Sequence, residues 1–267
     1  MALKILPAPA KCRALQEKTP MSFQLYRLEN GRYVATAFRD LDDKAFWCRL
    51  GNDKEAAFVR LAEQHPFGHA IAIHPAKAAD AYHPDLLVDG KDIGEVKIKN
   101  SPLFFGRSYG VDPQYALTMD LKDSFNYCRW LDRGVDIKIF IWVKWEAHRM
   151  ECAGRTYDVK PMAGVWRASF SSLRKKETSQ NPPGIHWYRE GFRQPTEHCG
   201  DGWETELIKF EPRLEIEKRG GATTAKNVSS NGFMESDGVR YPSGHSSGSY
   251  VFDLSDPGLF QRLAFER

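Results

Sequence analysis

The stretch HPDLLVDGKDIGEVKIKN, residues 83–100, decides the fold of this chain. Two apolar-rich runs lie on either side of Asp89-Gly90. Aspartate and glycine both tolerate the positive φ angles of a tight hairpin turn. The stretch therefore predicts two antiparallel β-strands that are joined at this dipeptide.

The second predicted strand presents two different faces. Because side chains alternate across a strand, Glu95 and Lys97 leave one face, while Val96 and Ile98 leave the other and point into the core. Antiparallel pairing through the turn places Asp85 opposite the Glu95 region, within about one residue of register. The hairpin therefore brings two carboxylates and one ammonium group together at the edge of a sheet.

Two carboxylates beside a lysine suit the hydrolysis of a phosphodiester. The reaction needs positive charge near the phosphate, an activated water and help for the leaving oxygen, and one or two magnesium ions supply much of this. Magnesium prefers hard oxygen ligands and keeps several of its waters, so it needs only a few carboxylates that converge on one point. A nearby lysine can orient the water and balance the charge of the phosphate.

Pro84-Asp85, nine intervening residues and then Glu95-Val96-Lys97 resemble the motif of the PD-(D/E)xK nuclease superfamily. The resemblance implies a restriction-endonuclease-like fold and a Mg²⁺ site in which Mn²⁺ also serves. It implies that Asp85 and Glu95 ligate the metal and that the backbone carbonyl of Val96 completes the ligand shell. Lys97 would then serve the water and the scissile phosphate.

For function, the resemblance implies a metal-dependent DNA endonuclease of a restriction or branch-resolving type, from a phage or a mobile element. Its partner is then DNA. The oligomeric state stays open, and a homodimer is one possibility by analogy, because restriction-like enzymes often cut both strands as dimers. Two alternatives stay open. One is an inert DNA- or protein-binding module on the same fold, and the other is an unrelated α/β protein in which the motif is a coincidence.

Glu55 is a candidate fourth member of the site. Many members of the superfamily carry an acidic residue on the helix before the motif strands, and residues 51–65 predict such a helix. Glu55 shares a face of this helix with Phe58 and Ala62, so it should point inward. The alternative is a capping box, in which Asn52 and Glu55 satisfy the free N–H groups at the helix start.

The elements around the hairpin predict an α/β fold with a mixed sheet that is flanked by helices. A nuclease core over residues 21–146 is expected to follow a loose arm at residues 1–20. The expected elements of the core are a hairpin turning at Asn30-Gly31, helices over residues 51–65 and 113–134, a short strand within residues 69–75, the hairpin of residues 83–100, and a central buried strand over residues 135–145.

Residues 147–267 predict a loop-rich extension that packs on the core. Its candidate DNA contacts are Arg167, Arg174 and Lys175, which join Lys99 of the hairpin, and a solvated surface is the alternative for all four cations. The expected elements are a helix over residues 163–177, a long loop over residues 178–203, a strand-like run over residues 206–219, a flexible loop over residues 219–249, a strand over residues 249–254 and a short helix over residues 257–265.

The bulk composition fits a globular protein. The chain has 267 residues, 42% of them hydrophobic, and a formal net charge of +3, so any nucleic-acid surface must be local. Five widely spaced cysteines without a Cys-x-x-Cys pair argue against a disulfide framework or a zinc knuckle, and they favour a reducing compartment. No run approaches the roughly 20 apolar residues of a membrane helix, so we expect a cytoplasmic protein that does not enter a membrane.

Overall fold

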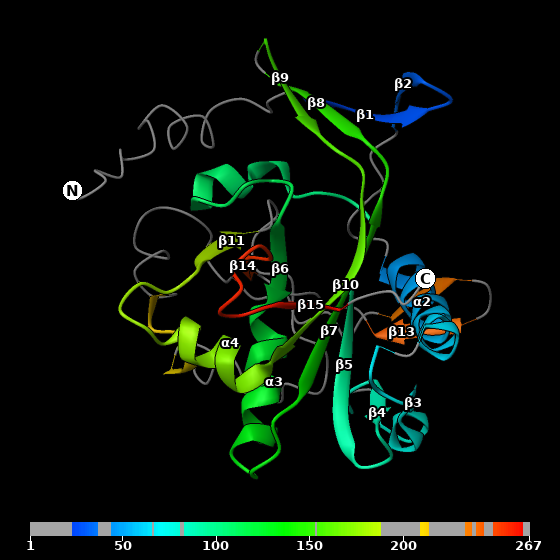
Figure 1. Cartoon of the computed structure of the whole chain (residues 1–267), viewed down its shortest axis with the longest axis vertical. Helices are drawn as coiled ribbons and strands as arrows, with labels where there is room; N and C mark the ends of the chain where they lie inside the picture. The colour runs from blue at the N-terminus through cyan, green and yellow to red at the C-terminus, as the bar shows by residue number, and fades with distance from the viewer. Residues whose placement is uncertain are drawn as a thin grey trace.

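The computed structural model describes residues 23–36, 44–65, 67–80, 83–152, 154–187, 209–213, 233–236, 239–242 and 248–263 (Figure 1). Over these ranges the chain is a mixed α/β protein with a mixed central sheet and few helices. The arm expected at residues 1–20 lies outside the described residues.

The central sheet has six strands in the order β15-β10-β7-β5-β4-β3. Within it, β5 and β7 pair in parallel, and the other neighbours are antiparallel. A parallel pair needs a crossover connection, which here contains helix α3 (Leu121–Leu131). The strands are β3 (Ile71–Ile73), β4 (Leu86–Val88), β5 (Asp92–Lys99), β7 (Lys138–Trp145), β10 (Met162–Ser169) and β15 (Gln261–Leu263).

The predicted β4–β5 hairpin is confirmed. The two strands pair antiparallel, with Leu86 opposite Gly94. The turn lies at Asp89 and Gly90, whose φ angles are 54° and 70°. At Gly94 the strands approach so closely that a Cβ atom would lie 2.8 Å from Cγ2 of Val88. Glycine is therefore required one position before the candidate site.

Both faces of the central sheet are covered by other elements. Helix α2 (Lys44–Gln64) packs on one face, where the Phe58 ring contacts the rings of Phe67 and Phe140. Helices α3 and α4 (Phe170–Glu177) pack on the opposite face, as Figure 1 shows. That face also contacts a three-stranded sheet in the order β11-β14-β6, made of β6 (Ala116–Asp120), β11 (Gly184–Trp187) and β14 (Gly248–Asp253).

Two smaller antiparallel sheets complete the described fold. A four-stranded sheet, in the order β2-β1-β8-β9, lies at the top of Figure 1. It contains the hairpin predicted at Asn30-Gly31, where both φ angles are positive. Its strands are β1 (Phe23–Glu29), β2 (Arg32–Ala35), β8 (His148–Cys152) and β9 (Arg155–Val159), and the separate pair is β12 (Phe233–Ser236) and β13 (Val239–Pro242).

The helix predicted over residues 113–134 is wrong in its first half. Residues Ala116–Asp120 form strand β6, and the helix begins at Leu121. Leu117 and Met119 are each 2% exposed, and they pair with Phe252 and Tyr250 of β14. This long-range pairing overrides the helical preference of the local sequence, because such preferences are weak.

Four further predicted elements are corrected. The helix expected over residues 163–177 is strand β10 as far as Ser169, because this segment pairs with β7 on one side and β15 on the other. The short helix expected over residues 257–265 is instead a turn followed by β15. Parts of the predicted loops form strands, namely β11 within residues 178–203 and the β12–β13 pair within residues 219–249.

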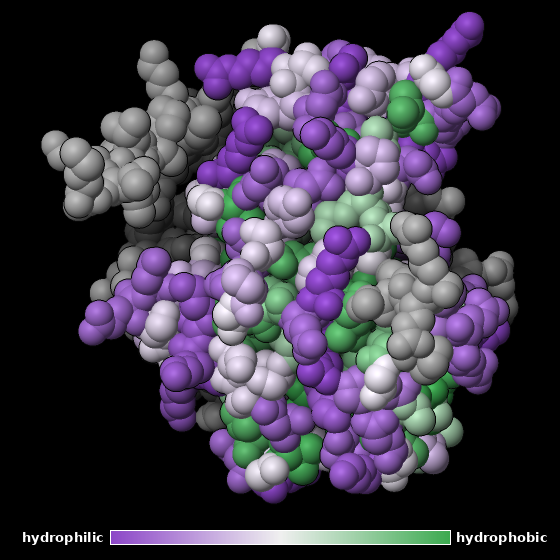
Figure 2. All heavy atoms as spheres, in the orientation of Figure 1, coloured by the Kyte–Doolittle hydropathy of each residue, from purple (hydrophilic) through white to green (hydrophobic). Residues whose placement is uncertain are grey.

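The surface of the described part of the chain is mainly hydrophilic. Figure 2 shows polar and charged residues across one face, with smaller apolar areas between them. The large hydrophobic side chains that stand out as exposed are Val34, Ile73 and Tyr115. No helix within the described ranges is both long enough and apolar enough to span a membrane.

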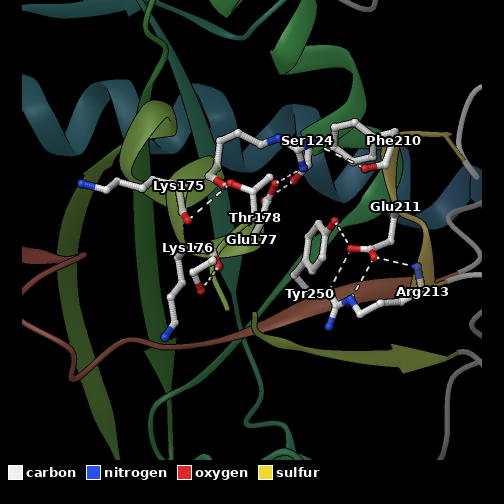
Figure 3. Close-up of polar contacts among 11 residues, drawn as sticks. Ser124, Lys175, Lys176, Glu177, Thr178, Phe210, Glu211, Arg213 and Tyr250 are labelled. Atoms are coloured by element: carbon white, nitrogen blue, oxygen red, sulfur yellow. Dashed lines mark hydrogen bonds and ion pairs between the residues drawn. The ribbon is translucent and has the colours of Figure 1, made fainter. Parts of the chain in front are cut away.

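A buried polar cluster fastens residues 209–213 to the core (Figure 3). These residues, which were expected to be strand-like, form no strand. The hydroxyl of Tyr250 donates to Oε2 of Glu211 over 2.7 Å, and Arg213 donates to the same carboxylate. A second carboxylate, that of Glu177, accepts a 2.8 Å bond from Ser124. The cluster therefore joins α3, α4 and β14 to residues 209–213.

From the raised pKa of the Glu177 carboxyl group we predict that the free energy of unfolding depends on pH. Its side chain is fully buried, and burial raises its pKa from 4.5 to about 7 despite hydrogen bonds from Arg174 and Ser124. Between these two pH values the folded chain keeps a proton that the unfolded chain releases, so this group lowers stability as pH rises. The unfolding free energy of the wild-type chain minus that of Glu177→Gln should therefore fall by up to about 3 kcal/mol between pH 4 and pH 8.

The measurement is urea unfolding of both proteins across that pH range. The exposed Glu146 offers a matched control, and Glu146→Gln should leave the wild-type pH profile unchanged. A constant difference between wild type and Glu177→Gln at every pH would contradict the prediction.

Gly94 offers a second test of the hairpin. Gly94→Ala should destabilise the protein by ~1–3 kcal/mol, because the added methyl group overlaps Val88 and crowds Leu86. Gly258→Ala is the matched control, since its new methyl would meet a carboxylate oxygen of Asp256 at 3.1 Å and should cost less. Equal midpoints of thermal unfolding for the two variants would show that the close strand approach is not required.

Candidate catalytic site

Asp85 and Glu95 lie side by side, as the hairpin register predicts. The backbone N–H of Asp85 donates to Oε2 of Glu95 over 3.2 Å. In return, the N–H of Val96 donates to Oδ2 of Asp85 over 3.4 Å. The two acidic residues are only 5% and 8% exposed. Each carboxylate is therefore oriented by the backbone of the strand that carries the other.

Lys97 joins this pair from the same face of β5. Its Nζ donates to Oε1 of Glu95 over 2.8 Å and to Oδ2 of Asp123 over 2.6 Å, and it lies 5.4 Å from the centre of the Tyr127 ring. Asp123 comes from the first turn of α3, on the crossover between β5 and β7. Asp123 was not among the residues predicted from the sequence, because the helix was expected to begin at residue 113 and its true start at Leu121 places Asp123 in the first turn.

Glu55 also contacts the site, through a second lysine, Lys77, which was not among the residues predicted from the sequence. Nζ of Lys77 lies 3.0 Å from Oε2 of Glu55 and forms an ion pair with Oδ1 of Asp85. The capping-box alternative for Glu55 is wrong, because α2 begins at Lys44 and both Asn52 and Glu55 lie inside the helix. The inward orientation expected for Glu55 is therefore the observed one.

Lys77 is held by a short structured loop. It lies on the 3₁₀ helix η1 (Pro75–Ala78), whose N-cap is His74, with Nδ1 accepting from the N–H of Ala76. The backbone N–H of His74 donates to the carbonyl of Asp85 over 2.8 Å. The rings of His74 and His83 stack with their centres 4.0 Å apart, and His83 meets the Trp130 ring edge-on. The loop is thus fastened to β4 and α3.

Neighbouring carboxylates determine the charge of Lys97, the lysine of the motif. Burial lowers the pKa of Lys97, but the carboxylates of Asp123 and Glu95 outweigh it and hold the pKa well above its ordinary value. Burial alone would raise the pKa of Asp123. The positive charges of Lys97 and Lys122 outweigh burial, so the pKa of this carboxyl lies below its ordinary value. Lys97 is therefore an ammonium group at neutral pH, suited to balance negative charge rather than to accept a proton.

Lys99 continues the same face of β5. Its Nζ donates to Oγ1 of Thr118 on β6 over 2.6 Å. Burial and the nearby Lys97 lower the pKa of Lys99 to about 8, against the opposing effect of Asp120. Lys99 is therefore the more easily deprotonated of the two lysines on this face.

The donor set fits a divalent cation, although no three His, Cys, Asp or Glu side chains of the described ranges are arranged around a common metal position. Four carboxylates face two ammonium groups, which leaves a formal charge of −2. Glu55 and Asp85 already contact one common cation, the ammonium of Lys77. The carbonyl of Val96 leaves the strand on the same edge as its N–H, toward Asp85. These are the hard oxygen ligands that Mg²⁺ prefers.

The remaining candidate residues have other contacts. Arg167 contacts His69 and Gln261, Arg174 donates to the buried Glu177, and Lys175 is exposed on α4. Gln114, which precedes β6, pairs with the backbone of residue 160. The contacts described for these four side chains do not reach the carboxylate cluster.

The Lys97–Asp123 contact predicts a measurable coupling. Removing either charge leaves the other one half-buried and short of a partner, whereas removing both relieves that cost. We expect Lys97→Met and Asp123→Asn to destabilise the protein singly, with a coupling of about 1–3 kcal/mol in the double-mutant cycle. Urea unfolding at pH 7 measures it, and strictly additive effects would contradict the described ion pair.

Comparison of this chain with models of protein families, with curated proteins and with solved structures found no match. The functional assignment of the site therefore rests on the residues and their geometry.

Proposed function

We propose that the chain is a metal-dependent deoxyribonuclease of the PD-(D/E)xK type, with a restriction-endonuclease-like core. The observation that carries the proposal is the convergence of Asp85, Glu95 and Lys97 at the β4–β5 hairpin. The backbone N–H of Asp85 and the ammonium of Lys97 both donate to the Glu95 carboxylate, and the carboxylate of Asp85 accepts from the backbone of β5. A coincidental motif would not be expected to place all three side chains together.

The order of elements supports the same proposal. Helix α2 is followed by β3, β4 and β5, and then by α3 and β7, with β6 inserted before α3. Apart from β6, this is the helix–strand–strand–strand–helix–strand order that the motif resemblance implies. In addition, the parallel β5–β7 pair brings the start of α3 to the candidate site, where Asp123 meets Lys97.

The residues divide into two roles in this proposal. Asp85, Glu95 and Glu55, with the carbonyl of Val96, would hold Mg²⁺, or Mn²⁺ in its place. The bound ion would supply positive charge at the phosphate and lower the pKa of a water molecule. Lys97, kept cationic by Asp123 and Glu95, is suited to hold the scissile phosphate and to stabilise the charge that develops on its oxygens.

The proposed substrate is DNA, whose backbone carries the negative charge that the site lysines can meet. Lys99 extends the row of cations along β5 beyond Lys97. Arg167 and Lys175 are further candidate phosphate contacts, and Arg174 is the weakest of them because its guanidinium already pairs with Glu177.

A cleavage assay tests the function. Supercoiled, linear and branched DNA are incubated with the protein and Mg²⁺, with Mn²⁺ in parallel. We expect cleavage of at least one substrate, and Asp85→Asn or Lys97→Met should lower the rate roughly 100-fold or more, as for other preorganised charges at a reacting phosphate.

The matched control is Lys144→Gln, which removes an exposed lysine of β7 and should retain the wild-type rate. Circular dichroism establishes that each variant is folded. Wild-type rates in the Asp85 and Lys97 variants would refute the assignment. DNA binding without any cleavage would instead support the alternative of an inert binding module.

A further inference from the structure

Lys77 has no part in the roles assigned above, yet it contacts two of the four carboxylates of the cluster. Its ammonium group contacts Glu55 and Asp85, two of the residues assigned to the metal. The three side chains are 21%, 17% and 7% exposed, so these charges are largely withdrawn from water. Ion pairs in such surroundings are stronger than exposed ones, because water screens them less.

The loop that carries Lys77 fixes its position relative to Asp85. Pro75 begins the 3₁₀ helix, and the N–H of Lys77 donates to the carbonyl of His74 over 3.1 Å. His74 in turn bonds the backbone of Asp85, and its ring stacks on His83. The lysine is therefore presented to the carboxylates by the backbone, not only by its flexible side chain.

An ammonium group and a divalent cation would compete for the same oxygen atoms. A metal ligand lies about 2.1 Å from Mg²⁺, so an ammonium that stays in contact with both carboxylates would be strongly repelled by the ion. Lys77 must therefore leave at least one carboxylate when a metal binds both of them. A phosphate of the nucleic acid is the natural new partner for the displaced ammonium.

We propose that Lys77 is a resident cation that occupies the Glu55–Asp85 pair in the free protein and moves to a substrate phosphate when metal and DNA bind. The proposal rests on the nuclease function proposed above. In this arrangement metal binding is weak without DNA and stronger with it. Because such coupling is reciprocal, bound metal strengthens DNA binding by the same factor. Lys77 is thus a positioning residue that links loading of the metal to the arrival of the substrate.

The test measures Mn²⁺ binding rather than cleavage. Free Mn²⁺ is quantified by electron paramagnetic resonance during titration of wild type, Lys77→Gln, Lys77→Met and Lys77→Arg. Without DNA, the two neutral variants should bind Mn²⁺ roughly tenfold tighter or more, because the competing charge is gone. Lys77→Arg keeps the charge and should resemble wild type, as should the control Lys144→Gln.

A second titration includes a short phosphorothioate duplex, which resists cleavage. The duplex should tighten Mn²⁺ binding to wild type by a larger factor than to Lys77→Gln. Equal Mn²⁺ affinity of wild type and both folded neutral variants without DNA would overturn the role of Lys77 and leave the nuclease proposal intact. Failure of every variant to bind Mn²⁺, with or without the duplex, would overturn both proposals.

Discussion

The antiparallel pairing of β4 and β5 is the constraint on which the candidate site depends. The turn at Asp89 and Gly90 sets the register, and the register sets which side chains face each other. A slip of one residue would move Glu95 to the opposite face of the sheet. The reciprocal bonds between the backbone and the carboxylates of Asp85 and Glu95 exist only in the observed register. The chemistry of the site is thus a direct result of a two-residue turn.

Around this hairpin, the site is assembled from elements that approach from both faces of the sheet. Helix α2 brings Glu55, and α3 brings Asp123. Positive and negative groups alternate through the cluster, so each carboxylate contacts a cation or a backbone N–H. Burying so many carboxylates without such partners would be very unfavourable. The two lysines and the backbone N–H groups are therefore what allows the acidic residues to gather beneath the surface.

The sequence predicted the parts of the fold that depend on short-range patterns. The β4–β5 hairpin and the central strand β7 were confirmed, because alternating or continuous apolar runs beside turn residues specify them locally. Strands β6 and β10 were mistaken for helix, since their partners β14 and β15 are distant in the sequence. Asp123 and Lys77 were missed for a related reason: their place at the site depends on a crossover and on a loop, and neither leaves a periodic signal in the sequence.

The pairing of β15 with β10 has a consequence for how the chain folds. Arg167 of β10 and Gln261 of β15 are 94 residues apart, while the hairpin closes between near neighbours. Contacts of such long sequence separation form late, because a long loop must be closed before they are gained. Until then, the free edge of β10 presents unpaired N–H and C=O groups to other chains. During synthesis on the ribosome, this edge is open to aggregation, and β15 is the strand that ends that exposure.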